Sequence, residues 1–227
     1  MKYFKSTVRN GLLGLAIFLT FPIVGLTLAQ DFVAINANDA AVKQLVDILD
    51  TTTTLTSDVE QLVMDQDGRE LQENRVELVM QKPASFYWAI KEPYEEATIT
   101  DGTVIWRYEP DLEQVTIQDF NDDVNRTPVM LLNGNEKSIA ESYEVSATNM
   151  DSTHTRFILL PRKPGNLFER LSLTFNGSTL EEMQFEDSLG QQTSLTFKQV
   201  VRNKEVDSSL FHFTPPDGVD VIDNTQE

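Results

Sequence analysis

The strongest constraint on the fold is a series of segments, from about Ser57 to Phe197, in which apolar and polar residues alternate. Successive side chains of a β-strand point to opposite faces, so each segment predicts a half-buried strand. The apolar members of these segments are Val76, Leu78, Met80; Phe86, Trp88, Ile90; Val104, Trp106, Tyr108; Phe157, Leu159; Leu171, Leu173, Phe175; Met183, Phe185; Leu195 and Phe197.

Turn-forming dipeptides such as Asp67-Gly68, Asp101-Gly102 and Asn176-Gly177 separate these segments. Such pairs are typical of hairpins, because glycine adopts the backbone angles that tight turns need. We therefore expect about eleven strands in one antiparallel sheet, curled into an open or closed barrel. No linker, shift in composition or internal repeat indicates a second domain.

Two stretches depart from this alternation. Val42, Leu45, Val46 and Leu49 have helical spacing, and with Asp39 as N-cap they predict an amphipathic helix over residues 40–53. Between residues 121 and 143 the sequence predicts two short helices. The first begins at Thr127-Pro128, and the second spans residues 136–143. All three helices are available to cover the concave side of a curled sheet.

The first 29 residues have the layout of a secretory signal peptide, with three basic residues, an apolar run and small residues before Gln30. We expect cleavage after Ala29 and a mature chain of residues 30–227 in the periplasm. The apolar run approaches the roughly 20 residues that span a bilayer, so an uncleaved anchor is the alternative. The sequence contains no cysteine, which leaves no disulfide and no residue for lipid attachment.

The formal net charge is −18, from 36 acidic and 18 basic residues. Such a chain repels phosphate backbones and anionic headgroups, so we expect neither nucleic-acid binding nor electrostatic docking on a membrane. The acidity either directs docking onto basic partner surfaces or simply keeps the surface solvated.

The sequence offers little for catalysis. It has no cysteine nucleophile and no GxSxG, P-loop or GxGxxG motif, and its two histidines, His154 and His212, lack a partner at ligand spacing. We therefore expect no enzyme, no metal and no cofactor. The aromatic and methionine content predicts an apolar interior, but the sequence leaves open whether side chains fill it or enclose a cavity for an acyl chain.

Several short motifs follow one another along the chain, and their order as a set is specific. They are Lys82-Pro83-Ala84-Ser85-Phe86-Tyr87-Trp88, Pro93, Thr100-Asp101-Gly102, Ile105-Trp106-Arg107-Tyr108, Pro110-Asp111-Leu112-Glu113-Gln114-Val115, Thr127-Pro128-Val129-Met130-Leu131-Leu132 and Phe211-His212-Phe213-Thr214-Pro215-Pro216-Asp217-Gly218-Val219. In order and spacing this set resembles the outer-membrane lipoprotein carrier family, LolA.

The resemblance implies an incomplete antiparallel β-barrel closed by a helical lid. It also implies a monomeric periplasmic carrier that takes acylated lipoproteins from an inner-membrane ABC exporter and delivers them to an outer-membrane receptor. Candidate contacts of the acyl chains, in the cavity or on the lid, are Phe86, Trp88, Trp106, Tyr108, Met130, Leu131, Phe157 and Phe175.

Lys82 stands where the resemblance implies an arginine that hydrogen-bonds the lid and controls its opening. A lysine lacks the planar fork of arginine, so lid closure is expected to be differently balanced. Alternatives are a lipid or peptide sensor, or a carrier of another lipid, on the same fold. A hydrolase would need an activated nucleophile or a metal site, which the sequence does not show.

Overall fold

The computed structural model describes residues 34–35, 38–120, 131–132, 136–163 and 168–225. The expected signal peptide, the expected start of the mature chain and the first inserted helix at Thr127 lie outside these residues. Within the described ranges no helix is both long enough and apolar enough to span a bilayer.

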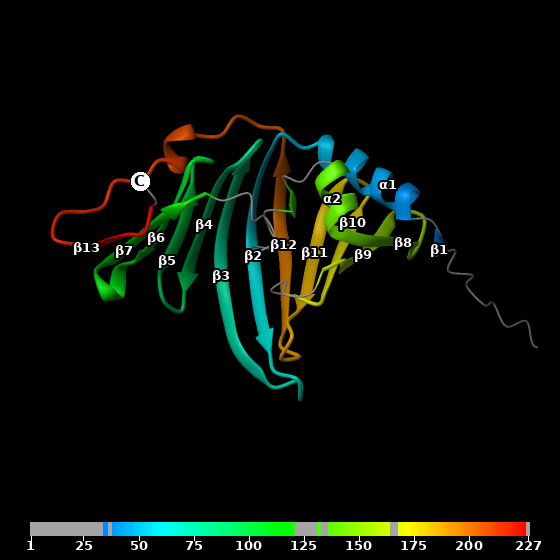
Figure 1. The fold of residues 1–227 in the computed structure, drawn as a ribbon, viewed down its shortest axis with the longest axis horizontal. Coiled ribbons are helices and arrows are strands. Elements are labelled where there is room, and N and C mark those ends of the chain that lie inside the picture. Colours follow the sequence, from blue (N-terminus) through cyan, green and yellow to red (C-terminus); the bar gives the residue numbers. More distant parts are fainter. Residues whose placement is uncertain (1–33, 36–37, 121–130, 133–135, 164–167, 226–227) are drawn as a thin grey trace, which may run out of the picture. The chain divides into compact units, whose positions relative to one another are not determined.

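A single sheet of thirteen strands makes up most of the described chain (Figure 1). The strands are β1 (Ala34–Ile35), β2 (Thr54–Met64), β3 (Glu70–Gln81), β4 (Ser85–Glu92), β5 (Glu96–Thr100), β6 (Val104–Glu109), β7 (Gln114–Asp119), β8 (Tyr143–Asn149), β9 (His154–Pro161), β10 (Arg170–Asn176), β11 (Thr179–Glu186), β12 (Gln192–Arg202) and β13 (Asp220–Asp223). The helices are α1 (Asn38–Asp50), α2 (Glu136–Ser142) and the 3-10 turns Pro110–Leu112 and Ser208–Phe211.

The sheet is open, with strand order β1-β8-β9-β10-β11-β12-β2-β3-β4-β5-β6-β7-β13. Every neighbouring pair is antiparallel except β13 with β7, so the predicted hairpin sheet with a helical lid is confirmed. Two strands go beyond the expected eleven. The strand β1 has only two residues, and all four residues of β13 are exposed. Such strands carry no alternation that a sequence pattern could detect.

One apolar cluster joins residues from β2 to β4, from β8 to β12 and from α1. We call the side of the sheet that carries Leu78, Phe86 and Phe157 the core face, and the opposite side the outer face. Because strands at both ends of this range contribute to one cluster, the sheet must curve around it. In Figure 1 the two helices lie beside the β8–β10 part of the sheet.

The helix α1 forms because its apolar residues fall on one stripe. Ala41, Val42, Leu45, Val46 and Leu49 are buried, while Lys43 and Asp47 form an exposed ion pair of 2.9 Å on the opposite side. The helix spans Asn38–Asp50 rather than the expected residues 40–53. It ends at the β-branched threonine run, where the Thr51 hydroxyl donates to the Ile48 carbonyl at 2.6 Å.

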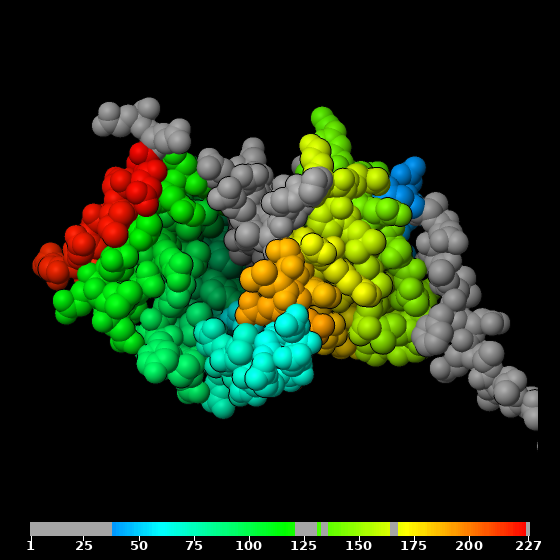
Figure 2. All heavy atoms as spheres, turned by 60° about the horizontal axis from the view of Figure 1, so that its bottom comes forward, coloured from blue at the N-terminus to red at the C-terminus, as the bar shows by residue number. Residues whose placement is uncertain are grey.

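The chain after β12 crosses from the middle of the sheet to its far edge. Its 3-10 turn Ser208–Phe211 packs against β4 and β5, and β13 then pairs with β7. Figure 2 shows these C-terminal residues, in red, along the green residues of the last strands. This C-terminal segment gives the outer face of β3–β7 its own apolar cover, which includes the buried Phe211.

We predict that Phe157→Ala lowers the free energy of unfolding by about 3–5 kcal/mol, because a fully buried ring leaves a cavity. Equilibrium urea unfolding followed by circular dichroism measures the change. Leu160→Ala is the matched control, because Leu160 lies on the same strand but is 43% exposed. Equal losses in the two variants would contradict the assignment of the core face.

Candidate ligand-binding site

The helix α1 and Leu131-Leu132 cover the core face of the sheet. The helix packs against β8 and α2, and both leucines are only 3% exposed within the main apolar cluster. Between these parts and the sheet remains a void of about 10 Å³, lined by Leu49, Met80 and Leu132 among others. That volume is barely enough for one water molecule. The sequence left open whether the interior is filled or hollow, and at this place the described side chains nearly fill it.

Lys82, at the turn between β3 and β4, ties this turn to the C-terminal end of α1. Its Nζ donates to the Leu49 carbonyl at 3.1 Å and lies 3.4 Å from Asp50 Oδ1. The last carbonyls of a helix lack intrahelical donors and carry partial negative charge, so a cation at this end is favourable. The last turn of α1 contains no basic residue of its own, and Lys82 supplies the charge from the sheet.

The end of β12 anchors the residues after α1 from a second side. Arg202 donates to the hydroxyls of Thr51 and Thr52, and Asn203 donates through Nδ2 to the Thr51 carbonyl at 2.7 Å. The Thr53 backbone N–H donates to Asn203 Oδ1 at 2.8 Å. No local sequence pattern predicts these two anchors, because their partners lie about 150 residues away in the chain.

The other end of α1 is joined to β8. The Val145 backbone N–H donates to Asn38 Oδ1 at 2.8 Å, and Tyr143 stacks on Phe168 with a centroid distance of 6.1 Å. Burial raises the pKa of the Tyr143 hydroxyl to about 12. The helix is thus held to the sheet by an apolar stripe and a small number of polar contacts at its two ends.

Five of the predicted ligand contacts come together in the main cluster: Phe86, Trp88, Leu131, Phe157 and Phe175. Phe86 and Trp88 stack with centroids 6.2 Å apart, and Phe157 meets Phe175 edge-on at 5.9 Å. These are favourable aromatic geometries. Met130, the sixth, lies outside the described residues.

Trp106 and Tyr108, the other two candidate contacts, do not lie with Phe86 on the core face. Residues paired across antiparallel strands share a face, and Trp106 pairs with Ile99, which pairs with Tyr87. Trp106 and Tyr108 therefore lie on the outer face. There Tyr108 contacts Phe213 of the C-terminal segment, with centroids 5.3 Å apart. The alternation in β6 is explained by this second cover rather than by the main core.

The core face loses its apolar character beyond β4. Phe86, Trp88 and Ile90 pair with Thr100, Thr98 and Glu96 of β5. Next to them, Arg107 of β6 forms an ion pair of 2.9 Å with Glu96. The apolar part of the core face is therefore bounded by a polar strip.

Both histidines lie beside carboxylates near the surface. His154 lies between two carboxylates, 2.7 Å from Asp151 and 3.3 Å from Glu181, at an exposed turn. Backbone N–H groups of Thr153 and His154 donate to Asp151 and hold its pKa well below the usual range. His212 is exposed and lies 3.8 Å from Asp101. In the part of the chain that the structure describes, no three His, Asp or Glu side chains are grouped to hold a metal ion.

The fold and the site together define a binding protein with an apolar sheet face covered by a helix. The sequence matches the family of the outer membrane lipoprotein carrier protein LolA over residues 50–214, most of the chain. The chain therefore belongs to the LolA family.

Curated relatives that bear the name outer-membrane lipoprotein carrier protein extend this match. The Hahella chejuensis protein is 40% identical over 82% of this chain and 90% of its own length. The Chromohalobacter salexigens protein is 36% identical over 88% and 94%, respectively.

Two solved structures are also similar to this chain. An uncharacterised conserved protein from Thermus thermophilus aligns with a TM-score of 0.50 over 80% of this chain and 98% of that chain, at 13% identity. A LolA superfamily protein from Nitrosomonas europaea gives a TM-score of 0.45 over 76% and 98%, at 12% identity.

We predict that Lys82→Leu loosens the end of α1. Hydrogen exchange of the backbone amides in its last turn should accelerate about fivefold, the effect of losing one charge-assisted hydrogen bond at a partly exposed site. Lys82→Arg is the control, because arginine keeps a donor and a charge at this position. Unchanged exchange in Lys82→Leu would show that the contact does not hold the helix.

Proposed function

We propose that this protein is a periplasmic carrier that shields the acyl chains of lipoproteins on the core face of its sheet. The observation that supports this most strongly is a large apolar sheet face covered by a short amphipathic helix. The cover buries its own apolar stripe on that face and is fixed at its ends by polar contacts of Lys82, Arg202 and Asn203. Membership of the LolA family supports the same function.

The free energy of burying α1 is similar to that of burying an acyl chain, so one can replace the other on the core face. Burying the five apolar side chains of α1 contributes on the order of 5–10 kcal/mol. An acyl chain contributes about 0.8 kcal/mol per buried CH₂, so about ten such groups offset the loss of the helix contacts. A long acyl chain can therefore replace α1 on the core face. When the ligand leaves, α1 returns and hides the apolar surface from water.

The proposed cycle has two partners. The carrier accepts lipoproteins from an ATP-driven exporter of the inner membrane and passes them to a receptor in the outer membrane. Phe86, Trp88, Leu131, Phe157 and Phe175 are the proposed acyl contacts, and Lys82 is proposed to set the balance between the closed and open positions of α1.

The test of this function is lipoprotein release from membranes. Inner-membrane vesicles that contain the exporter and a labelled lipoprotein are incubated with the purified protein, with and without ATP. The expected result is an ATP-dependent soluble complex of one carrier with one lipoprotein. The absence of release, with the exporter shown to be active toward an established carrier, would instead favour a sensor or a carrier of another lipid. In the same assay we expect Lys82→Leu to take up lipoprotein but to transfer it poorly to the receptor.

The chain contains two tryptophans, which lie on opposite faces of the sheet and so report on the position of the acyl chain. We predict that a brominated acyl chain quenches the fluorescence of Trp88 but not that of Trp106. Trp106→Phe isolates Trp88, and Trp88→Phe isolates Trp106 for the matched measurement. Stronger quenching of Trp106 would place the ligand on the outer face and overturn the proposed site.

A further inference from the structure

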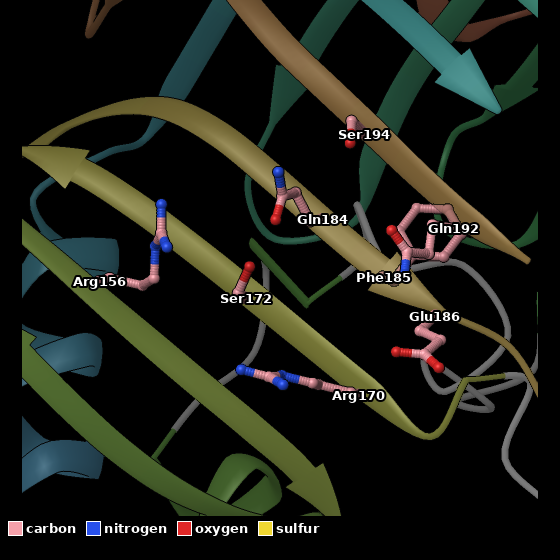
Figure 3. A pocket seen from close by; sticks show the side chains of 8 residues that line it. All are labelled: Arg156, Arg170, Ser172, Gln184, Phe185, Glu186, Gln192 and Ser194. Carbon is pink, nitrogen blue, oxygen red and sulfur yellow. The ribbon is translucent and has the colours of Figure 1, made fainter. Parts of the chain in front are cut away.

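A small polar hollow lies on the outer face of β9–β12, on the opposite side of the sheet from the main cluster (Figure 3). Its volume is about 200 Å³. Its residues follow directly from the register. Leu171 and Leu173 of β10 are fully buried on the core face, so the intervening Ser172 must point to the outer face.

The hollow lies where the two short serine side chains of a middle row are flanked by two rows that contain long charged side chains. The middle row runs across the sheet as Ser172, Gln184 and Ser194. The rows beside it contain Arg156 with Glu182 on one side and Arg170 with Glu186 on the other. Gln184 lines the hollow, and its Nε2 donates to Glu182 Oε1 at 2.8 Å.

Two arginines flank the floor of this hollow in a chain whose net charge is −18. Figure 3 shows Arg170 extending along the sheet toward Ser172 and away from Glu186, although Glu186 is its cross-strand neighbour. Among the described residues Arg170 has no ion pair or side-chain hydrogen bond. Arg156 is only partly engaged, by Thr174 at 3.2 Å and by Glu182 at 3.6 Å.

The Ser172 hydroxyl is the second, independent observation. Ser172 is 8% exposed and points into the hollow, and no side-chain hydrogen bond joins it to any other described residue. Buried hydroxyls nearly always have a partner, because an unsatisfied polar group is costly. A buried hydroxyl without a partner, beside an arginine without a partner, is the arrangement expected of a site that is completed by a ligand.

We propose that this hollow binds a small oxyanion, with a phosphate group as the best match. Guanidinium groups donate two parallel hydrogen bonds to phosphate oxygens, and the Ser172 hydroxyl supplies a further donor from the floor. The hollow, of about 200 Å³, is large enough to accept a phosphate group. Such a group is supplied either by inorganic phosphate or by the headgroup of a phospholipid. The site is separate from the acyl site and does not rest on the proposed carrier function.

The experiment is a titration of the isotope-labelled protein with inorganic phosphate, followed by NMR at the amides of Ser172, Gln184 and Ser194. Sodium chloride of equal ionic strength serves as the salt reference. The expected result is saturable shifts confined to the hollow, with a dissociation constant that increases about tenfold in Arg170→Gln, the cost of one charge-assisted contact. Ser172→Ala should weaken binding while leaving the thermal midpoint of unfolding nearly unchanged.

Arg75→Gln is the matched control. It removes the same charge from β3, where Arg75 pairs with Glu92 at 3.3 Å outside the hollow. Equal weakening of phosphate binding in Arg75→Gln and Arg170→Gln would overturn the proposal, and so would chemical shifts that do not saturate. Either result would indicate a non-specific electrostatic effect of the whole protein rather than a site.

A second titration, with a short-chain phosphatidylglycerol below its micelle concentration, distinguishes the two sources. Binding stronger than that of inorganic phosphate assigns the site to a lipid headgroup, and equal or weaker binding assigns it to the free ion. Lipoprotein release should be unchanged in Arg170→Gln, so that failure of this site and failure of the carrier function are seen separately.

Discussion

The packing of α1 on the core face of the sheet is the contact on which the rest of the structure depends. The apolar stripe of this helix joins side chains of β2–β4 to those of β8–β12 in one cluster. Without it, an open sheet of this size would present a large apolar surface to water, which soluble proteins rarely tolerate. The polar contacts of Lys82, Arg202 and Asn203 add comparatively little stability, but they determine where the end of the helix lies. A cover held mainly by non-directional packing can be replaced by another apolar body, and an acyl chain is such a body.

Different parts of the sheet bury apolar residues on different faces, and this explains how the sheet remains open. The main cluster ends at β4, where threonine and the Glu96–Arg107 ion pair take over the core face. Beyond this line the outer face becomes the apolar one, and the C-terminal segment covers it. The far strands are thus stabilised without closing the sheet into a complete barrel. The short strand β13 forms the edge of the sheet beside β7, so the backbone groups of β7 are paired on both sides.

The few basic residues of this acidic chain hold distinct structural positions. Lys82 and Arg202 stabilise the end of α1 and the threonines that follow it, and Arg107 borders the apolar region. Arg170 is different, since it lies beside a buried serine on the outer face and has no partner among the described residues.

The sequence by itself determined the period of each strand, the apolar stripe of α1 and the family, because these depend on residues close together in the chain. It placed Phe86, Trp88, Leu131, Phe157 and Phe175 in one apolar interior, and the structure brings them together. Only the tertiary structure decided on which face of the sheet the apolar residues of each alternating segment lie. Alternation in β6 is identical whether Trp106 faces the main cluster or the C-terminal segment, and strand register alone separates the two. The anchors Arg202 and Asn203 and the hollow beside Ser172 were likewise decided by pairing between distant segments, which no local pattern encodes.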